Sequence, residues 1–158
     1  LHAADVAVLL RAWDRLLEAG HTLLVADSTL EVVRREAPEI QTACLSAQQA
    51  FADNILARET ASPWNAGLHV SQFGGSLPRL VKSAGGAIWS PYFGEVTAAA
   101  VREAQQLGLK VVVWTVNDER DMEQMISLGV DGIISDYPDR LRRISAAHGL
   151  QLPTATPV

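Results

Sequence analysis

Apolar and polar positions follow two different periods along the chain. Short runs rich in β-branched residues predict strands. The five predicted strands span His21–Ser28, Ile40–Ala47, Ala87–Phe93, Lys110–Asn117 and Gly132–Pro138. Helical spacing lies before, between and after them, at 4–20, 28–39, 76–86, 95–108, 118–129 and 139–149. The segment 48–75 lacks a clear period and predicts a short helix and a long loop.

Strands that alternate with helices at short intervals predict an α/β fold with a parallel sheet. The strands are nearly continuous apolar runs, such as "VVV" at 111–113, as expected when both faces of a sheet are covered. We expect residues 1–149 to form this α/β unit and residues 150–158 to be a flexible tail.

Polar and aromatic residues gather where the predicted strands end. In parallel α/β folds, ligands bind beyond these carboxyl ends. Trp114 shares a strand face with Val112, and it either lines a site or fills the core. Tyr92 follows another strand, and a structural role is the alternative for it as well. Asp136 either contacts a ligand, by orienting a substrate hydroxyl or by joining a metal's outer shell, or caps or braces the final helix.

Two neighbours of these candidates have a simpler interpretation. Asn117 and Asp118 immediately precede a helical pattern, so either side chain is expected to cap that helix, with substrate contact as the alternative.

Composition narrows the class of protein. The chain is 48% hydrophobic and 20% charged, with a net charge of -5, which is typical of a globular domain without a basic surface for nucleic acid or anionic lipid. No apolar run reaches the roughly 18 residues of a membrane span. Cys44 is the single cysteine, so no intrachain disulfide can form, and we expect it to behave as a small buried apolar residue.

The N-terminus shows no signal-peptide pattern, which favours a cytoplasmic location. The first residue is Leu1 rather than Met, so we expect a processed or truncated product.

The segments "KVVVWTVND" from Lys110 and "GVDGIISDYP" from Gly129 resemble the last two strands of glycerophosphodiester phosphodiesterases. The upstream segments "APEIQTACLS" and "LVKSAGGAIWSPYFGEVT" are similar to the same family. The resemblance implies a (β/α)₈ TIM barrel of which this chain holds an incomplete part, about five of eight βα units. It also implies a divalent metal, Ca²⁺ or Mg²⁺, and hydrolysis of small glycerophosphodiesters to glycerol 3-phosphate and an alcohol.

The resemblance further implies which groups to search for. The family's His-Arg-Gly motif, Glu-x-Asp pair, His-Asp motif and metal-binding Glu belong to its early strands, and this sequence shows none of these motifs. We therefore expect no catalytic or metal-binding residue here, and an isolated chain that is inactive. Trp114, Tyr92 and Asp136 remain as substrate-binding candidates. The alternative is a non-catalytic half-barrel that serves as a binding or interaction module.

An incomplete barrel also has a consequence for assembly. Five of eight strands leave two unpaired sheet edges and an exposed apolar inner face, so we expect self-association through these edges.

Overall fold

The structure is a computed structural model, and it describes residues 35, 42–56, 65 and 67–152 of the chain. The strand predicted at His21–Ser28 and the helix predicted at 4–20 lie outside the described residues, as does nearly all of the helix predicted at 28–39.

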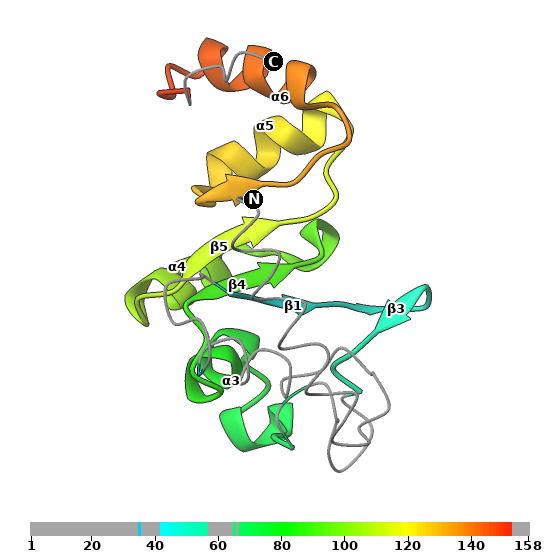
Figure 1. The fold of residues 1–158 in the computed structure, drawn as a ribbon, viewed down its shortest axis with the longest axis vertical. Coiled ribbons are helices and arrows are strands. Elements are labelled where there is room, and N and C mark those ends of the chain that lie inside the picture. The colour runs from blue at the N-terminus through cyan, green and yellow to red at the C-terminus, as the bar shows by residue number, and fades with distance from the viewer. Residues whose placement is uncertain (1–34, 36–41, 57–64, 66, 153–158) are drawn as a thin grey trace.

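A parallel sheet forms the centre of the described part (Figure 1). Its four strands are β1 (Ala43–Ser46), β4 (Ile88–Pro91), β5 (Lys110–Val113) and β6 (Gly132–Ile133). They lie side by side in the order in which they occur along the chain, as the staves of a barrel do. The parallel α/β prediction is confirmed, and within the described residues the sheet does not close on itself.

The observed strands are shorter than the predicted ones. β4 ends at Pro91, which has no N–H to extend a ladder, and one isolated bridge between Tyr92 and Trp114 continues the pairing. β6 ends at Ile133, after which the chain turns toward the last helix. The polar ends of the predicted strands therefore belong to the loops that follow the sheet.

The four predicted helices after residue 75 are all present. They are α3 (Leu77–Ser83), α4 (Ala98–Gln106), α5 (Glu119–Leu128) and α6 (Pro138–Ala147). The Ser76 hydroxyl accepts the backbone N–H of Arg79 at 3.2 Å and starts α3. The Thr97 hydroxyl accepts the N–H of Ala100 at 3.2 Å and starts α4 in the same way.

Helix α5 ends at a glycine, as its sequence predicts. Gly129 has a φ of 76°, in the left-handed region, and its N–H bonds carbonyls of the last helical turn. The reversal there returns the chain to the sheet within a few residues, and α5 packs against α6. Short connections of this kind produce the regular βα alternation.

The main hydrophobic core lies between one face of the sheet and the helices. Trp89, Val111 and Val113 point into it and are almost fully buried. Half-buried Cys44 packs against the same core, so its apolar role agrees with the prediction while its burial is only partial. On the other face, Leu45 is exposed. This second face is the one that a barrel would enclose.

The prediction for the start of segment 48–75 is wrong. The chain forms an antiparallel hairpin from β2 (Gln48–Gln49) and β3 (Ala52–Asp53), which projects beyond the carboxyl end of β1 (Figure 1). Further along, the described helix in this segment is one 3₁₀ turn, η2 (Val70–Phe73). A second 3₁₀ turn, η3 (Phe93–Glu95), follows β4.

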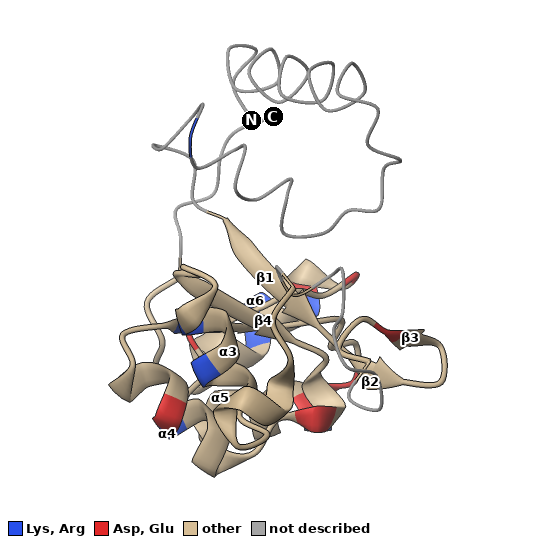
Figure 2. Ribbon diagram, turned by 90° about the horizontal axis from the view of Figure 1, so that it is seen from below, with Lys and Arg blue, Asp and Glu red and all other residues tan. Residues whose placement is uncertain are grey.

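Charged residues of both signs lie on the helices, whereas β1 and β4 carry none (Figure 2). No helix in the described part of the chain is long and apolar enough to cross a bilayer.

Candidate substrate wall

The loops after β1, β4 and β5 all start at the carboxyl end of the parallel sheet. The N–H of Tyr92 donates to the carbonyl of Ser46 at 2.8 Å, and the N–H of Phe93 donates to the carbonyl of Trp114 at 3.0 Å. These bonds continue the ladder past the ends of the strands and fix where the following side chains begin. In parallel α/β folds, ligands bind at this carboxyl end of the strands.

Trp114 lies on the inner face of the sheet, opposite to the helices. Its indole Nε1–H donates to the carbonyl of Ser90 at 2.8 Å, and its side chain is half-buried. Trp89 has the opposite orientation: it is 2% exposed, and its Nε1–H donates to Ser46 Oγ at 2.9 Å within the core. Of these two tryptophans, Trp114 alone keeps appreciable solvent-accessible surface.

Tyr92 lies at the centre of an aromatic cluster. Its ring centroid is 5.8 Å from that of Trp114, in an edge-to-face arrangement, and 4.9 Å from that of Phe93. The Phe51 ring of the hairpin lies 5.2 Å away on another side. The structure thus brings the two aromatic candidates together and adds Phe51, which the sequence analysis missed because it placed residue 51 in an irregular segment.

The hairpin is tied to the loop after β4. Glu95 Oε1 accepts the backbone N–H of Gln48 at 2.7 Å and the side-chain amide of Gln49 at 2.7 Å. Asn54 fastens the other end: its Oδ1 accepts the N–H of Ala47 at 2.9 Å, and its Nδ2 donates to the carbonyl of Leu45 at 2.9 Å. A lone hairpin is marginally stable in water, so these tethers determine where Phe51 lies.

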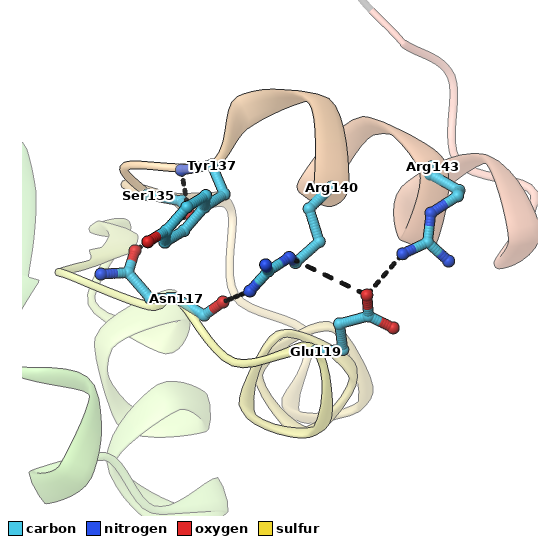
Figure 3. Close-up of polar contacts among 6 residues, drawn as sticks. All are labelled: Asn117, Glu119, Ser135, Tyr137, Arg140 and Arg143. Atoms are coloured by element: carbon cyan, nitrogen blue, oxygen red, sulfur yellow. Dashed lines mark hydrogen bonds and ion pairs between the residues drawn. The ribbon is translucent and has the colours of Figure 1, made fainter.

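Asp136 joins a separate polar network around Asn117, part of which Figure 3 shows. Asn117 Nδ2 donates to Asp136 Oδ2 at 2.9 Å, and Asn117 Oδ1 accepts the N–H of Asp136 at 3.0 Å. Ser135 Oγ also donates to Asn117 Oδ1, at 3.3 Å. Within the described residues, no ring contact or hydrogen bond joins Asp136 to Trp114 or Tyr92.

The capping expectation for α5 holds for the position and not for the side chain. Asp118 occupies the cap position but makes no side-chain cap hydrogen bond, and the Asn117 side chain binds Asp136. The cap position of α6 is Tyr137, so Asp136 does not cap that helix; its carboxylate binds Asn117.

The same network fastens α6 to α5 (Figure 3). Arg140 donates to the backbone carbonyl of Asn117 at 2.6 Å, and its guanidinium lies 4.3 Å from the Tyr137 ring centroid. Glu119 pairs with Arg143 at 2.5 Å and with Arg140 at 3.8 Å. Helix α6 is therefore attached both to the loop after β5 and to the first residue of α5.

The divalent metal that the resemblance implies does not find a site among the described residues. They contain no group of three or more His, Cys, Asp or Glu side chains placed to hold an ion. At the carboxyl end of the sheet the described residues supply aromatic surface, amide groups and exposed carboxylates, among them Asp136. This chemistry can contact a substrate, and we assign no metal-dependent step to it.

Comparison with known proteins identifies relatives. The sequence model of the glycerophosphoryl diester phosphodiesterase family matches residues 5–140. A curated glycerophosphodiester phosphodiesterase from Caldanaerobacter subterraneus subsp. tengcongensis is 41% identical over 51 residues, which cover 32% of this chain and 21% of that protein. Lysophospholipase D GDPD3 from Homo sapiens is 41% identical over 49 residues, covering 31% of this chain and 15% of that protein.

Solved phosphodiesterase structures share the fold of this chain. A glycerophosphoryl diester phosphodiesterase homologue from Silicibacter pomeroyi superposes with a TM-score of 0.62 at 40% identity, covering 80% of this chain and 38% of that one. An Oleispira antarctica phosphodiesterase, solved with its product sn-glycerol-3-phosphate, has a TM-score of 0.54 at 18% identity, covering 75% of this chain and 38% of that one. The chain thus spans well under half the length of these relatives.

Proposed function

Because this chain belongs to the glycerophosphoryl diester phosphodiesterase family, we propose that it forms one wall of a site for small glycerophosphodiesters, at the edge of the sheet where Trp114 lies. The observation that carries the proposal is the Trp114 indole. Its hydrogen bond to the Ser90 carbonyl at 2.8 Å holds the ring on the inner face, beside Tyr92.

Each candidate residue has a defined task in this proposal. The face of Trp114 packs against the carbon skeleton of the glycerol or the alcohol, because aromatic rings cover apolar C–H surface well. Tyr92 supports that ring from its edge, with a centroid distance of 5.8 Å. Asp136 accepts a hydrogen bond from a substrate hydroxyl through Oδ1, since Asn117 engages its Oδ2. The glycerol phosphate bound by the Oleispira antarctica protein supports this ligand class.

Binding is the direct test of this wall. Titration of the purified chain with glycerol 3-phosphate by isothermal calorimetry should show saturable binding. Trp114→Ala should weaken binding about tenfold, the loss expected when a large aromatic contact of 1–2 kcal/mol disappears. An unchanged dissociation constant in that variant would show that Trp114 does not contact the ligand.

Hydrolysis needs more than a wall. Phosphodiester cleavage in metal-dependent enzymes uses an ion to stabilise developing charge and an acid–base group to move the proton. We propose that this 158-residue chain lacks both and does not turn over substrate alone. The assay follows release of glycerol 3-phosphate from glycerophosphocholine with Mg²⁺ or Ca²⁺, and uses the Caldanaerobacter subterraneus protein as the positive control. Metal-dependent release by the chain itself would contradict the proposal.

A binding module without catalysis is the second candidate, and one observation favours it. The described residues combine a preformed aromatic surface with no acidic cluster for a metal. Saturable binding without turnover fits this module as well as a catalytic barrel that lacks its other half. Adding a separately expressed segment of the early strands from a relative distinguishes them: restored turnover identifies an enzyme fragment.

A further inference from the structure

Phe51 is exposed to an unusual degree for an aromatic residue. It lies at the turn between β2 and β3, and 66% of it is accessible to solvent. Single exposed apolar residues are common on protein surfaces. Phe51 differs because its ring also makes an edge contact with Tyr92, at a centroid distance of 5.2 Å. It is therefore part of an ordered surface.

Three rings lie in sequence from the sheet to the hairpin. Tyr92 contacts Phe51 at 5.2 Å on one side and Trp114 at 5.8 Å on another. We call Phe51, Tyr92 and Trp114 the aromatic strip. It begins at the proposed substrate wall and ends at the exposed turn of the hairpin. The apolar surface continues along the inner face through Leu45, 56% exposed, which pairs in register with Ser90.

The chemistry of the strip favours an apolar ligand over a cation. The nearby carboxylates already accept hydrogen bonds from the hairpin: Glu95 Oε1 accepts two, and Glu95 Oε2 is inaccessible to solvent. On the hairpin, Asp53 Oδ1 accepts the N–H groups of Ile55 at 3.0 Å and Leu56 at 2.9 Å. A bound ammonium group would compete with these hydrogen bonds, and phenylalanine at the exposed end of the strip is a weaker cation–π partner than tryptophan, so the strip favours hydrocarbon.

We propose that the aromatic strip binds an apolar chain of the phosphodiester, and that Phe51 determines this specificity. The inference rests on the proposed function, since it takes the phosphodiester to lie beside Trp114. An extended alkyl chain carries enough methylenes to contact all three rings in turn, which a choline or ethanolamine group does not. The ligand class is thus a glycerophosphodiester whose alcohol carries an extended hydrocarbon chain.

The test uses the purified chain and three synthetic ligands, the ethyl, butyl and octyl esters of glycerol 3-phosphate, each kept below its micelle-forming concentration. Isothermal calorimetry should show affinity rising with chain length, by about tenfold from ethyl to octyl, as partial burial of added methylenes predicts. Phe51→Ala should abolish this rise and leave the affinity for the ethyl ester unchanged. Since Phe51 is 66% exposed, this substitution should also leave the unfolding midpoint unchanged.

Leu150→Ala is the matched control, because Leu150 is also apolar and exposed, at 48%, but lies after α6. It should retain the full dependence on chain length. Equal affinity for all three esters, or a rise in affinity that persists in Phe51→Ala, would overturn the inference. In either case, binding of the ethyl ester would still support the proposed function. Failure of the ethyl ester to bind would instead overturn the proposed function, and with it the premise of this inference.

Discussion

Asn117 and Asp136 bind each other through two hydrogen bonds. Asn117 Nδ2 donates to Asp136 Oδ2 at 2.9 Å, and the backbone N–H of Asp136 donates to Asn117 Oδ1 at 3.0 Å. One residue follows β5 and the other follows β6, so a single side-chain amide bridges the ends of two neighbouring strands. This bridge places the Asp136 carboxylate and the start of α6.

Asn117→Ala should therefore destabilise the fold. It removes the bonds to Asp136 and the bond from Ser135 Oγ at 3.3 Å, and it leaves the backbone N–H of Asp136 without this acceptor. We expect a loss of about 1–3 kcal/mol in the free energy of unfolding, measured by urea denaturation.

Asp118→Ala is the control for this substitution. Asp118 is adjacent in sequence and occupies the cap position of α5, but its side chain forms no cap hydrogen bond. We expect a loss below about 1 kcal/mol, limited to its interaction with the helix dipole. If Asp118→Ala costs as much as Asn117→Ala, helix capping rather than the bridge stabilises this region.

The helices could be predicted because their signals are local. Ser76 and Thr97 are hydroxyl residues immediately before apolar periodic segments, and both cap a helix. Gly129 stands where the period of its helix ends, and it adopts the left-handed conformation that stops the helix. Each signal acts within a few residues, so a short stretch of sequence is enough to predict where a helix begins or ends.

The hairpin and the Asn117 bridge could not be predicted because their partners are distant. Gln49 and Glu95 are 46 positions apart, and Asn117 and Asp136 are 19 apart. The turn at 50–51 is Ala-Phe, without the glycine or asparagine that usually marks a tight hairpin. Residue 117 also satisfies the local rule for a helix cap, and the tertiary bonds take its side chain away from that role.

Trp114 and Trp89 offer a test that separates binding from stability. Trp114→Phe keeps an aromatic ring but loses the hydrogen bond to the Ser90 carbonyl. We expect weaker binding of glycerol 3-phosphate, about threefold to tenfold, because the ring is no longer held in one orientation. Calorimetric titration of the variant measures this change.

Trp89→Phe should change stability and not ligand binding. Trp89 is 2% exposed in the core and donates to Ser46 Oγ. The substitution should lower the free energy of unfolding by about 1–3 kcal/mol and leave the ligand affinity of the folded protein unchanged. A comparable loss of affinity in both variants would mean that Trp114 acts through packing and not through ligand contact.

Glu95 should control the position of the hairpin. Glu95→Ala removes the acceptor for Gln48 N–H and for the Gln49 amide, both at 2.7 Å. We expect faster cleavage within residues 48–53 in limited proteolysis, because the hairpin opens more often without its tether. Glu95→Gln retains an acceptor oxygen and should be cleaved at nearly the original rate. Rapid cleavage of both variants would show that the charge, rather than the acceptor, holds the hairpin.

The open inner face should drive self-association. Leu45 is 56% exposed and Ile134 is 48% exposed, and they lie at the two sides of the described sheet. Within the described residues, β6 pairs with β5 alone, so its outer edge presents backbone groups that a second chain can pair with. We expect sedimentation velocity to show a concentration-dependent increase in mass.

Ile134→Lys should reduce this association, because a charge on the apolar face must lose its hydration when a second copy docks. Leu150→Lys is the matched control, since Leu150 has the same 48% exposure but lies beyond α6, away from the sheet. It should leave the mass distribution unchanged. Because both substitutions add one positive charge, a reduction in both would point to net charge as the cause. A monomer at every concentration in the unaltered chain would show that this face does not recruit a second copy.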